Sequence, residues 1–184
     1  ASDQARDMNA VREAVEFSYG DAFSRVIYTE SHDEVANGSA RVPQEVNDDD
    51  PTGYYAQKRS TLGAALVLTS PGLPMIFQGQ EFLEGEWFRD TVPLHWDQGA
   101  QFKGIFRMYR DLIGLRRNEE GHTKGLTGQN VETLHLHPGN HVYVFHRWAD
   151  GGPHDDVVVA LNLDSKTWGD YTVGMPAAGR WVTR

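Results

Sequence analysis

Two short apolar runs, each ending abruptly in polar and ionisable residues, constrain the fold of this chain more than any other feature. Residues 25–29 lead directly into the polar stretch 30–34, and residues 75–77 lead into the polar stretch 78–81. Each apolar run is too short for a helix. Buried parallel strands that deliver side chains to the mouth of a barrel have this pattern. We therefore predict two parallel strands whose ends carry a candidate site.

The chain divides into a helical part and a strand-rich part. Apolar residues recur at helical spacing around the two short strands, with Tyr55 and Leu62 on the expected inner face of the second helix, whereas beyond residue 120 the pattern alternates. We expect an α/β domain over residues 1–120 and an antiparallel β-sandwich domain over residues 121–184. The predicted helices are residues 4–17, 53–69 and 101–117, and the predicted strands of the β domain are residues 131–137, 141–148, 156–163 and 171–173. Residues 34–52 and 78–99 are predicted loops, and residues 150–153 a turn.

Composition excludes several classes of partner. The chain has 184 residues, a formal net charge of -9 and no cysteine. Excess negative charge repels phosphate groups, so we expect neither a nucleic acid nor an anionic membrane as a partner, whereas a neutral glucan meets no such penalty. No apolar run approaches the roughly 18 residues of a membrane span. Without cysteine there is no disulfide framework, which fits the cytoplasmic location that we expect.

His32 and Asp33 are the residues best suited to chemistry, because they are adjacent and follow a predicted buried strand. An ionised Asp can accept two hydroxyl hydrogen bonds from one sugar, and an imidazole N–H can donate to another sugar oxygen. Glycoside cleavage needs such groups, since binding energy distorts the sugar ring towards a positively charged transition state. From pattern alone a plainer alternative stays open, in which Asp33 caps the loop and His32 packs.

These two runs resemble the last two barrel strands of the α-amylase superfamily of glycoside hydrolases and transglycosidases. The resemblance rests on residues 31–35 (Ser-His-Asp-Glu-Val), 37–38 (Asn-Gly) and 58–59 (Lys-Arg). It implies an α/β part formed by the last two strand-helix units of a (β/α)8 TIM barrel, followed by an all-β domain. It also implies that Asp33 is the catalytic carboxylate that holds the sugar in the cleavage subsite, with His32 binding substrate beside it.

The residue before the His-Asp pair favours one branch of that superfamily. Many of the hydrolases have Asn there, whereas Ser31 makes this chain more similar to the glycogen (1,4-α-glucan) branching enzymes. The resemblance therefore implies a retaining enzyme that transfers an α-1,4-linked segment to a 6-hydroxyl of another chain. An α-amylase-type hydrolase, a non-catalytic glucan-binding module and a purely structural part remain alternatives.

The nucleophilic Asp and the acid/base Glu of the superfamily have no counterpart here, because they belong to strands that would precede Ala1. The chain also opens close to the start of a predicted helix with no strand before it, and closes within a strand-like run at residues 179–184, so we expect a C-terminal fragment. One stabilising carboxylate cannot replace two working ones, and we expect the isolated chain to be inactive. Two strand-helix units alone would leave open sheet edges and apolar area, which predicts a homo-oligomer through the exposed barrel edges.

Three further polar residues are candidate substrate-binding groups. Glu34 follows the His-Asp pair, and Gln80 and Glu81 follow the second strand. Loop solvation is the alternative role for all three, and structural hydrogen bonds are another for Gln80 and Glu81. The neighbouring segment 87–89 (Trp-Phe-Arg) has the chemistry to stack on a glucan, but we expect it to pack between the barrel and the β domain.

We expect neither a metal nor a cofactor. The four histidines His135, His137, His141 and His146 fall near one another in sequence, and the first two share a strand face. No matching carboxylate or cysteine pattern accompanies them. The acidic run 48–50 lacks the spacing of a calcium loop, and we expect it to be solvated.

Overall fold

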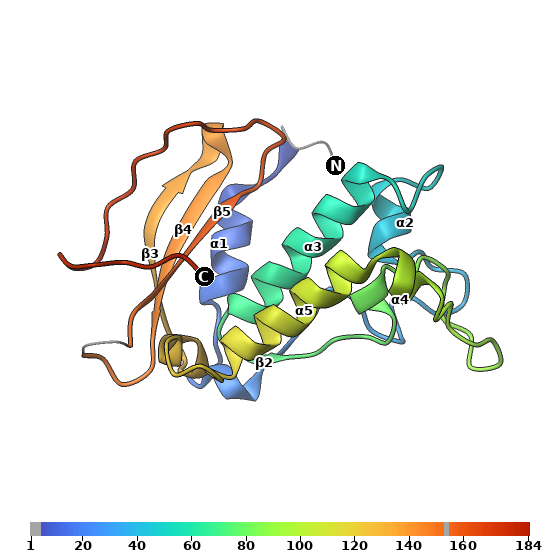
Figure 1. Ribbon diagram of the computed structural model, residues 1–184, viewed down its shortest axis with the longest axis horizontal. Helices are drawn as coiled ribbons and strands as arrows, with labels where there is room; N and C mark the ends of the chain where they lie inside the picture. Colours follow the sequence, from blue (N-terminus) through green and yellow to red (C-terminus); the bar gives the residue numbers. More distant parts are fainter. Residues whose placement is uncertain (1–4, 153–154) are drawn as a thin grey trace.

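The computed structural model describes residues 5–152 and 155–184. A three-stranded sheet lies at one end, α1 packs against it, and the long helices α3 and α5 lie side by side beyond α1 (Figure 1). The helices are α1 (Met8–Glu16), α2 (Val42–Val46), α3 (Tyr54–Thr69), α4 (Gln98–Gln101) and α5 (Lys103–Arg116). Short 3-10 helices are η2 (Ala22–Ser24), η3 (Gln80–Phe82), η4 (Lys124–Thr127) and η5 (Pro138–Asn140). The strands are β1 (Val26–Ile27), β2 (Leu73–Pro74), β3 (Asn130–His137), β4 (Val142–Trp148) and β5 (Val157–Asn162).

Strands β3, β4 and β5 form an antiparallel sheet in sequence order. The central strand β4 is buried along almost its whole length, because it has a strand on each edge and α1 packs against the sheet. The strands predicted between residues 131 and 163 are therefore confirmed. The second sheet of the predicted sandwich is not present among the residues that the structure describes.

The strand predicted at residues 171–173 is wrong. This segment has irregular backbone and joins no ladder. It is attached to the sheet by a side chain instead, since the Tyr171 hydroxyl lies 2.9 Å from Nε2 of His135. The segment therefore contacts the sheet through a side chain and is not one of its strands.

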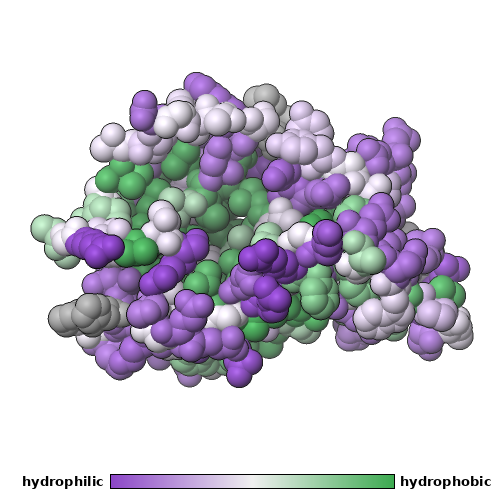
Figure 2. Space-filling model, viewed as in Figure 1, coloured by the Kyte–Doolittle hydropathy of each residue, from purple (hydrophilic) through white to green (hydrophobic). Residues whose placement is uncertain are grey.

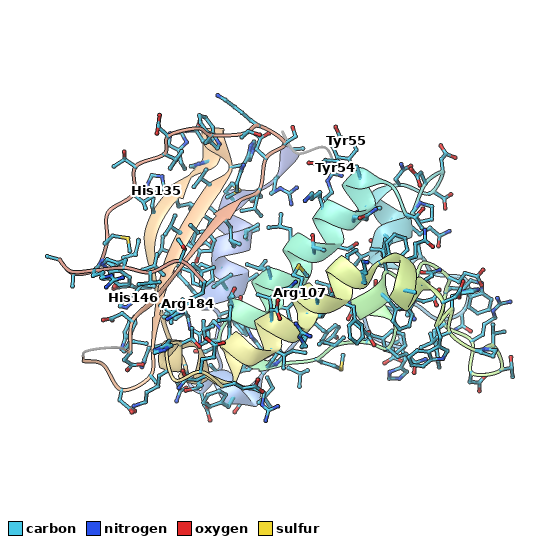
Figure 3. All side chains as sticks on the ribbon, in the orientation of Figure 1. Tyr54, Tyr55, Arg107, His135, His146 and Arg184 are labelled. Atoms are coloured by element: carbon cyan, nitrogen blue, oxygen red, sulfur yellow. The ribbon has the colours of Figure 1, made fainter. Side chains whose placement is uncertain are left out.

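Helix α3 lies between two apolar clusters. The first cluster joins α3 to α1 and the sheet, and the second joins α3 to α5 and the loop after β2. Because α3 is covered on two sides, its apolar residues do not lie along one stripe. Placing Tyr55 on an inner face is wrong, since its ring is exposed at the N-terminal end of α3 (Figure 3). Leu62 and Leu66 of α3 belong to the first cluster, and Ala64 and Leu68 to the second.

The two short strands pair in parallel, as predicted, but the pairing is short. Only two residue pairs form the ladder, between β1 and β2. Residues 75–77, the predicted second strand, follow β2 and lie outside it. The ladder ends there because the Phe77 N–H bonds to the side-chain oxygen of Gln80, at 2.7 Å, and not to a neighbouring strand.

One side of the β1–β2 pair faces solvent. Val26 and Leu73, which are directly paired, are 52% and 48% exposed, so the prediction that these strands are buried is wrong for that side. The physical reason is that no further strand of the described residues pairs with this small sheet. Apolar area of this kind is normally covered by another element or another chain.

Several boundaries also differ from prediction. Helix α1 begins at Met8 because the Asp7 carboxylate accepts the first free N–H groups of the helix, and residue 4, the predicted start, lies outside the described residues. Helix α2 falls in a predicted loop and begins with Pro43 in its first turn. The predicted helix over 101–117 is preceded by α4 and interrupted at Phe102. Residue 153 of the predicted turn is likewise not described.

Among the described residues, no helix is both long and apolar enough to cross a membrane.

A buried arginine joins the sheet to the helical part. Arg147 of β4 is fully buried, and its guanidinium donates hydrogen bonds to the carbonyls of Thr69, Leu126, Gly128 and Asn130. Burial, together with the nearby positive charge of Arg116, lowers the pKa of Arg147 to about 9, so the group remains a cation at neutral pH. Its contacts attach the C-terminal end of α3 to the sheet.

Replacing this arginine tests the attachment. Arg147→Met is expected to lower the free energy of unfolding by about 3 kcal/mol, because several buried carbonyls lose their donors at once. Arg107→Met on α5 is the matched control, since that side chain is largely exposed and pairs only with a neighbouring carboxylate (Figure 3). Its effect should stay within about 0.5 kcal/mol. Urea denaturation measures both, and equal losses in the two variants would contradict the assigned role.

Candidate functional site

The His-Asp pair lies on a turn that is anchored at both ends. The buried Ser31 carbonyl accepts hydrogen bonds from the N–H groups of Glu34 and Val35, at 3.2 and 3.1 Å, and Val35 is buried as well. Between these anchors the side chains of His32 and Asp33 are 68% and 84% exposed. The turn therefore has a fixed backbone and presents two polar side chains to solvent.

His32 and Asp33 contact one another. Nε2 of His32 lies 3.1 Å from Oδ1 of Asp33, so the imidazole ring faces one carboxylate oxygen at ion-pair distance. The turn N–H groups bond to Ser31 and not to Asp33, which leaves the carboxylate without a capping task in the turn. A carboxylate oriented in this way can accept hydrogen bonds from sugar hydroxyl groups.

Gln80 connects the ends of the two short strands. Its amide nitrogen donates to the Thr29 hydroxyl and its amide oxygen accepts from the Phe77 N–H, both at 2.7 Å. Both ends of this half-buried amide are therefore used within the protein. Of the three roles weighed for Gln80, the structure favours a structural hydrogen bond over loop solvation, and a role in substrate binding stays a prediction.

Glu81 and Glu34 lie at different depths. Glu81 is half-buried, and its carboxylate accepts the Gly79 N–H at 3.0 Å. Gly79 has a φ of +91°, and a Cβ there would lie 2.6 Å from the Cβ of Glu84, so only glycine fits this bend. Glu34 is exposed at the end of the His32–Asp33 turn. The structure thus places Glu34 beside the candidate pair and Glu81 on the neighbouring loop.

The segment 87–89 was predicted to pack between the barrel and the β domain. The structure places it elsewhere, so this prediction is wrong. Phe88 packs edge-on against Phe77, with ring centroids 5.5 Å apart, and its N–H bonds to the Val35 carbonyl. The Arg89 guanidinium lies over the Trp87 ring at 4.8 Å. These residues belong to the loop at the end of the molecule away from the sheet (Figure 1). Of the three, Phe88 contacts the candidate turn, through the Val35 carbonyl.

This end of the molecule, with α2, α4 and the loops between them, has a mainly hydrophilic surface, whereas apolar side chains gather in a hollow beside the sheet (Figure 2).

The sequence pattern did not identify two buried residues near the candidate turn. Glu30 and Arg41 are both buried and form an ion pair of 3.2 Å directly below the candidate turn. No local signal marks them, because they are separated in sequence and Arg41 lies in a predicted loop.

The histidines of the sheet are occupied by local partners. His146 lies between Glu132 and Asp156, at 3.0 and 2.7 Å, and His141 contacts Asp164 at 2.9 Å. His135 and His146 lie well apart on the sheet (Figure 3). Within the described part of the chain, no three His, Cys, Asp or Glu residues are arranged to hold a metal ion.

Comparisons with known proteins show which families this chain is similar to. Residues 134–183 match the family "Alpha amylase, C-terminal all-beta domain". A 1,4-alpha-glucan branching enzyme GlgB from Pseudomonas fluorescens is 33% identical over 178 residues, which are 90% of this chain and 23% of that protein. The corresponding enzyme from Marinobacter nauticus is 27% identical over 82% of this chain and 24% of its own length.

The chain is related to the α-amylase superfamily. The resemblance to branching enzymes is confirmed, as is the all-β domain with an antiparallel sheet. The chain spans about a quarter of the length of the curated relatives that it matches. Among solved structures, a pullulanase of Anoxybacillus sp. complexed with maltotetraose superposes with a TM-score of 0.65 at 21% identity, over 89% of this chain and 26% of that one. This likeness concerns the fold alone.

A second ion pair holds the loop that follows η3. Glu84 is buried, and burial alone would raise its pKa, but hydrogen bonds from the backbone and ring of His95 and from the Glu86 N–H outweigh burial and lower the pKa. The same contact, 3.0 Å from Nδ1 of His95 to Oε1 of Glu84, raises the pKa of His95. Both shifts favour the charged pair.

The pH dependence of stability tests this pair. The Glu84 contribution is present above the ordinary value of 4.5 and is lost as the pH falls, because the folded-state pKa is lowered. The His95 contribution is complete below 6.5 and is lost as the pH rises through the raised folded-state pKa. His95→Gln should therefore lower the melting temperature most between these two values.

Circular dichroism melts at about pH 5.5 and about pH 9 measure this difference. The gap between the wild type and His95→Gln should be clear at the lower pH and small at the higher one. His122→Gln, at an exposed histidine, should show little change at either pH. A gap of the same size at both values would contradict a charged Glu84–His95 pair.

Proposed function

We propose that this chain forms one wall of the glucan site of a retaining 1,4-α-glucan branching enzyme. In this proposal the β1–α3 and β2–α5 units are the last two strand-helix units of a (β/α)8 barrel, and β3–β5 belong to a β domain that follows it. Asp33 holds hydroxyl groups of the sugar at the cleavage subsite, and His32 binds beside it. The proposal includes a cytoplasmic location.

One observation carries this proposal. Asp33 is an exposed carboxylate on the turn that follows the parallel strand β1, and Ser31 and Val35 at the two ends of that turn are buried. Polar side chains at the carboxyl ends of barrel strands are where such folds bind substrate. The similarity to branching enzymes over most of the chain supports α-glucan as the ligand.

The exposed side of the β1–β2 pair also supports it. Val26 and Leu73 present apolar area that the remaining strands of a barrel would cover. Those strands would also supply the nucleophilic and acid/base carboxylates that retaining chemistry needs about 5 Å apart. Alone, the chain would lack both carboxylates, would be inactive, and would cover its exposed side with a second copy.

Asp33→Asn in the full-length natural protein tests the function. The substitution keeps the shape of the side chain and removes the charge that strengthens hydrogen bonds to sugar hydroxyls in the transition state. We expect kcat for amylose to fall by about 10²- to 10³-fold. Asp49→Asn, in the loop between α2 and α3, is the matched control and should keep wild-type activity.

Product analysis by proton NMR distinguishes the candidate reactions. Branching yields new α-1,6 linkages with no net gain of reducing ends, whereas an α-amylase-type hydrolase yields reducing ends alone. If Asp33→Asn and Asp49→Asn behave alike, the assignment of Asp33 is wrong. If the wild type binds glucan without changing it, the chain belongs to a binding module.

A further inference from the structure

Several buried polar contacts near the candidate turn converge on the Arg41 guanidinium. Its Nε donates to the Glu86 carbonyl at 2.8 Å, and its Nη1 donates to the Gln78 carbonyl at 2.9 Å and to the Glu30 carboxylate at 3.2 Å. The guanidinium also lies over the Phe77 ring, 4.9 Å from its centroid. A single side chain thus connects the end of β1 to the loop after β2.

Glu30 is fixed by the same arrangement. It is buried and stands two residues before His32. One of its carboxylate oxygens contacts Arg41 and the other accepts the Val42 N–H at 2.9 Å. Because Glu30 is held at both oxygens, the backbone that enters the candidate turn has little freedom to shift.

The acidic residues around Arg41 offset part of the cost of burying its charge. Burial lowers the pKa of Arg41, and Glu30, Glu84 and Glu81 act in the opposite direction. Burial raises the pKa of Glu30, and Arg41 opposes that rise. Burying either charge without the other would be costly, so the two residues stabilise each other only as a pair.

We propose that Arg41, through its ion pair with Glu30, is a positioning residue that holds the His32–Asp33 turn in the geometry that binds glucan. This inference rests on the proposed function of that turn. Arg41 is itself buried and bonds to Glu30, Gln78 and Glu86, so in this proposal it acts on the ligand through the turn. Small displacements of a binding group are enough to lose affinity, since hydrogen bonds depend steeply on distance and angle.

A double-mutant cycle distinguishes positioning from a purely structural role. The dissociation constant of maltoheptaose is measured by calorimetry on the full-length natural protein for the wild type, Arg41→Lys, Asp33→Ala and the double variant. Lysine keeps the charge but cannot reproduce the forked contacts of the guanidinium. Arg41→Lys should weaken binding about tenfold in the wild type and less than about twofold when Asp33 is already absent, because the two residues act in series.

Two further variants separate binding from folding. Arg116→Lys removes another guanidinium, which is half-buried and donates to the Ser70 and Gly72 carbonyls, and should lower stability without changing the dissociation constant. Glu30→Gln keeps the oxygen that accepts the Val42 N–H and removes the ion pair. It should therefore raise the dissociation constant of maltoheptaose as Arg41→Lys does.

The outcomes are distinct. If folded Arg41→Lys binds maltoheptaose like the wild type, or weakens binding equally with and without Asp33, the positioning role is overturned while the proposed function stands. If Asp33→Ala leaves the dissociation constant unchanged, the turn does not bind glucan, and the proposed function and this inference fail together.

Discussion

Backbone carbonyls at the ends of strands and helices need donors when they are buried, and in this protein guanidinium groups supply them. Arg147 does so where α3 meets the sheet, and Arg41 does so where β1 meets the loop after β2. Each arginine joins segments that are far apart in sequence. A guanidinium suits this task because it carries five donors in a rigid plane. The packing of α3 and the geometry of the candidate turn both depend on these contacts.

Features governed by local periodicity could be predicted from the sequence. The alternation after residue 120 predicted β3, β4 and β5, and the helical spacing predicted α1, α3 and α5 within a few residues. The parallel pairing of β1 and β2 followed from two short apolar runs that end in polar residues. The exposure of His32 and Asp33 at the end of β1 fits that reading, because a strand that ends abruptly presents the residues after it.

Features that depend on distant partners could not be predicted. Arg41 resembles any loop arginine until Glu30, Gln78 and Glu86 are brought around it. From the sequence the amide of Gln80 fits substrate binding, a structural hydrogen bond or loop solvation, and its contacts with Thr29 and the Phe77 N–H reveal the structural role. The strand predicted at residues 171–173 was wrong because alternation also arises where a segment touches a sheet by side chains alone. In each instance the deciding contact joins residues too far apart in the sequence for a local pattern to reveal it.

The central claim is that the turn carrying His32 and Asp33 receives glucan. The most direct measurement is a titration of the ¹⁵N-labelled chain with maltoheptaose, followed by amide chemical shifts. The account predicts that the amides of residues 31–35 shift most, and that those of β3, β4 and β5 stay in place. Saturable shifts confined to the sheet or to the segment after it, with the turn unaffected, would contradict the claim.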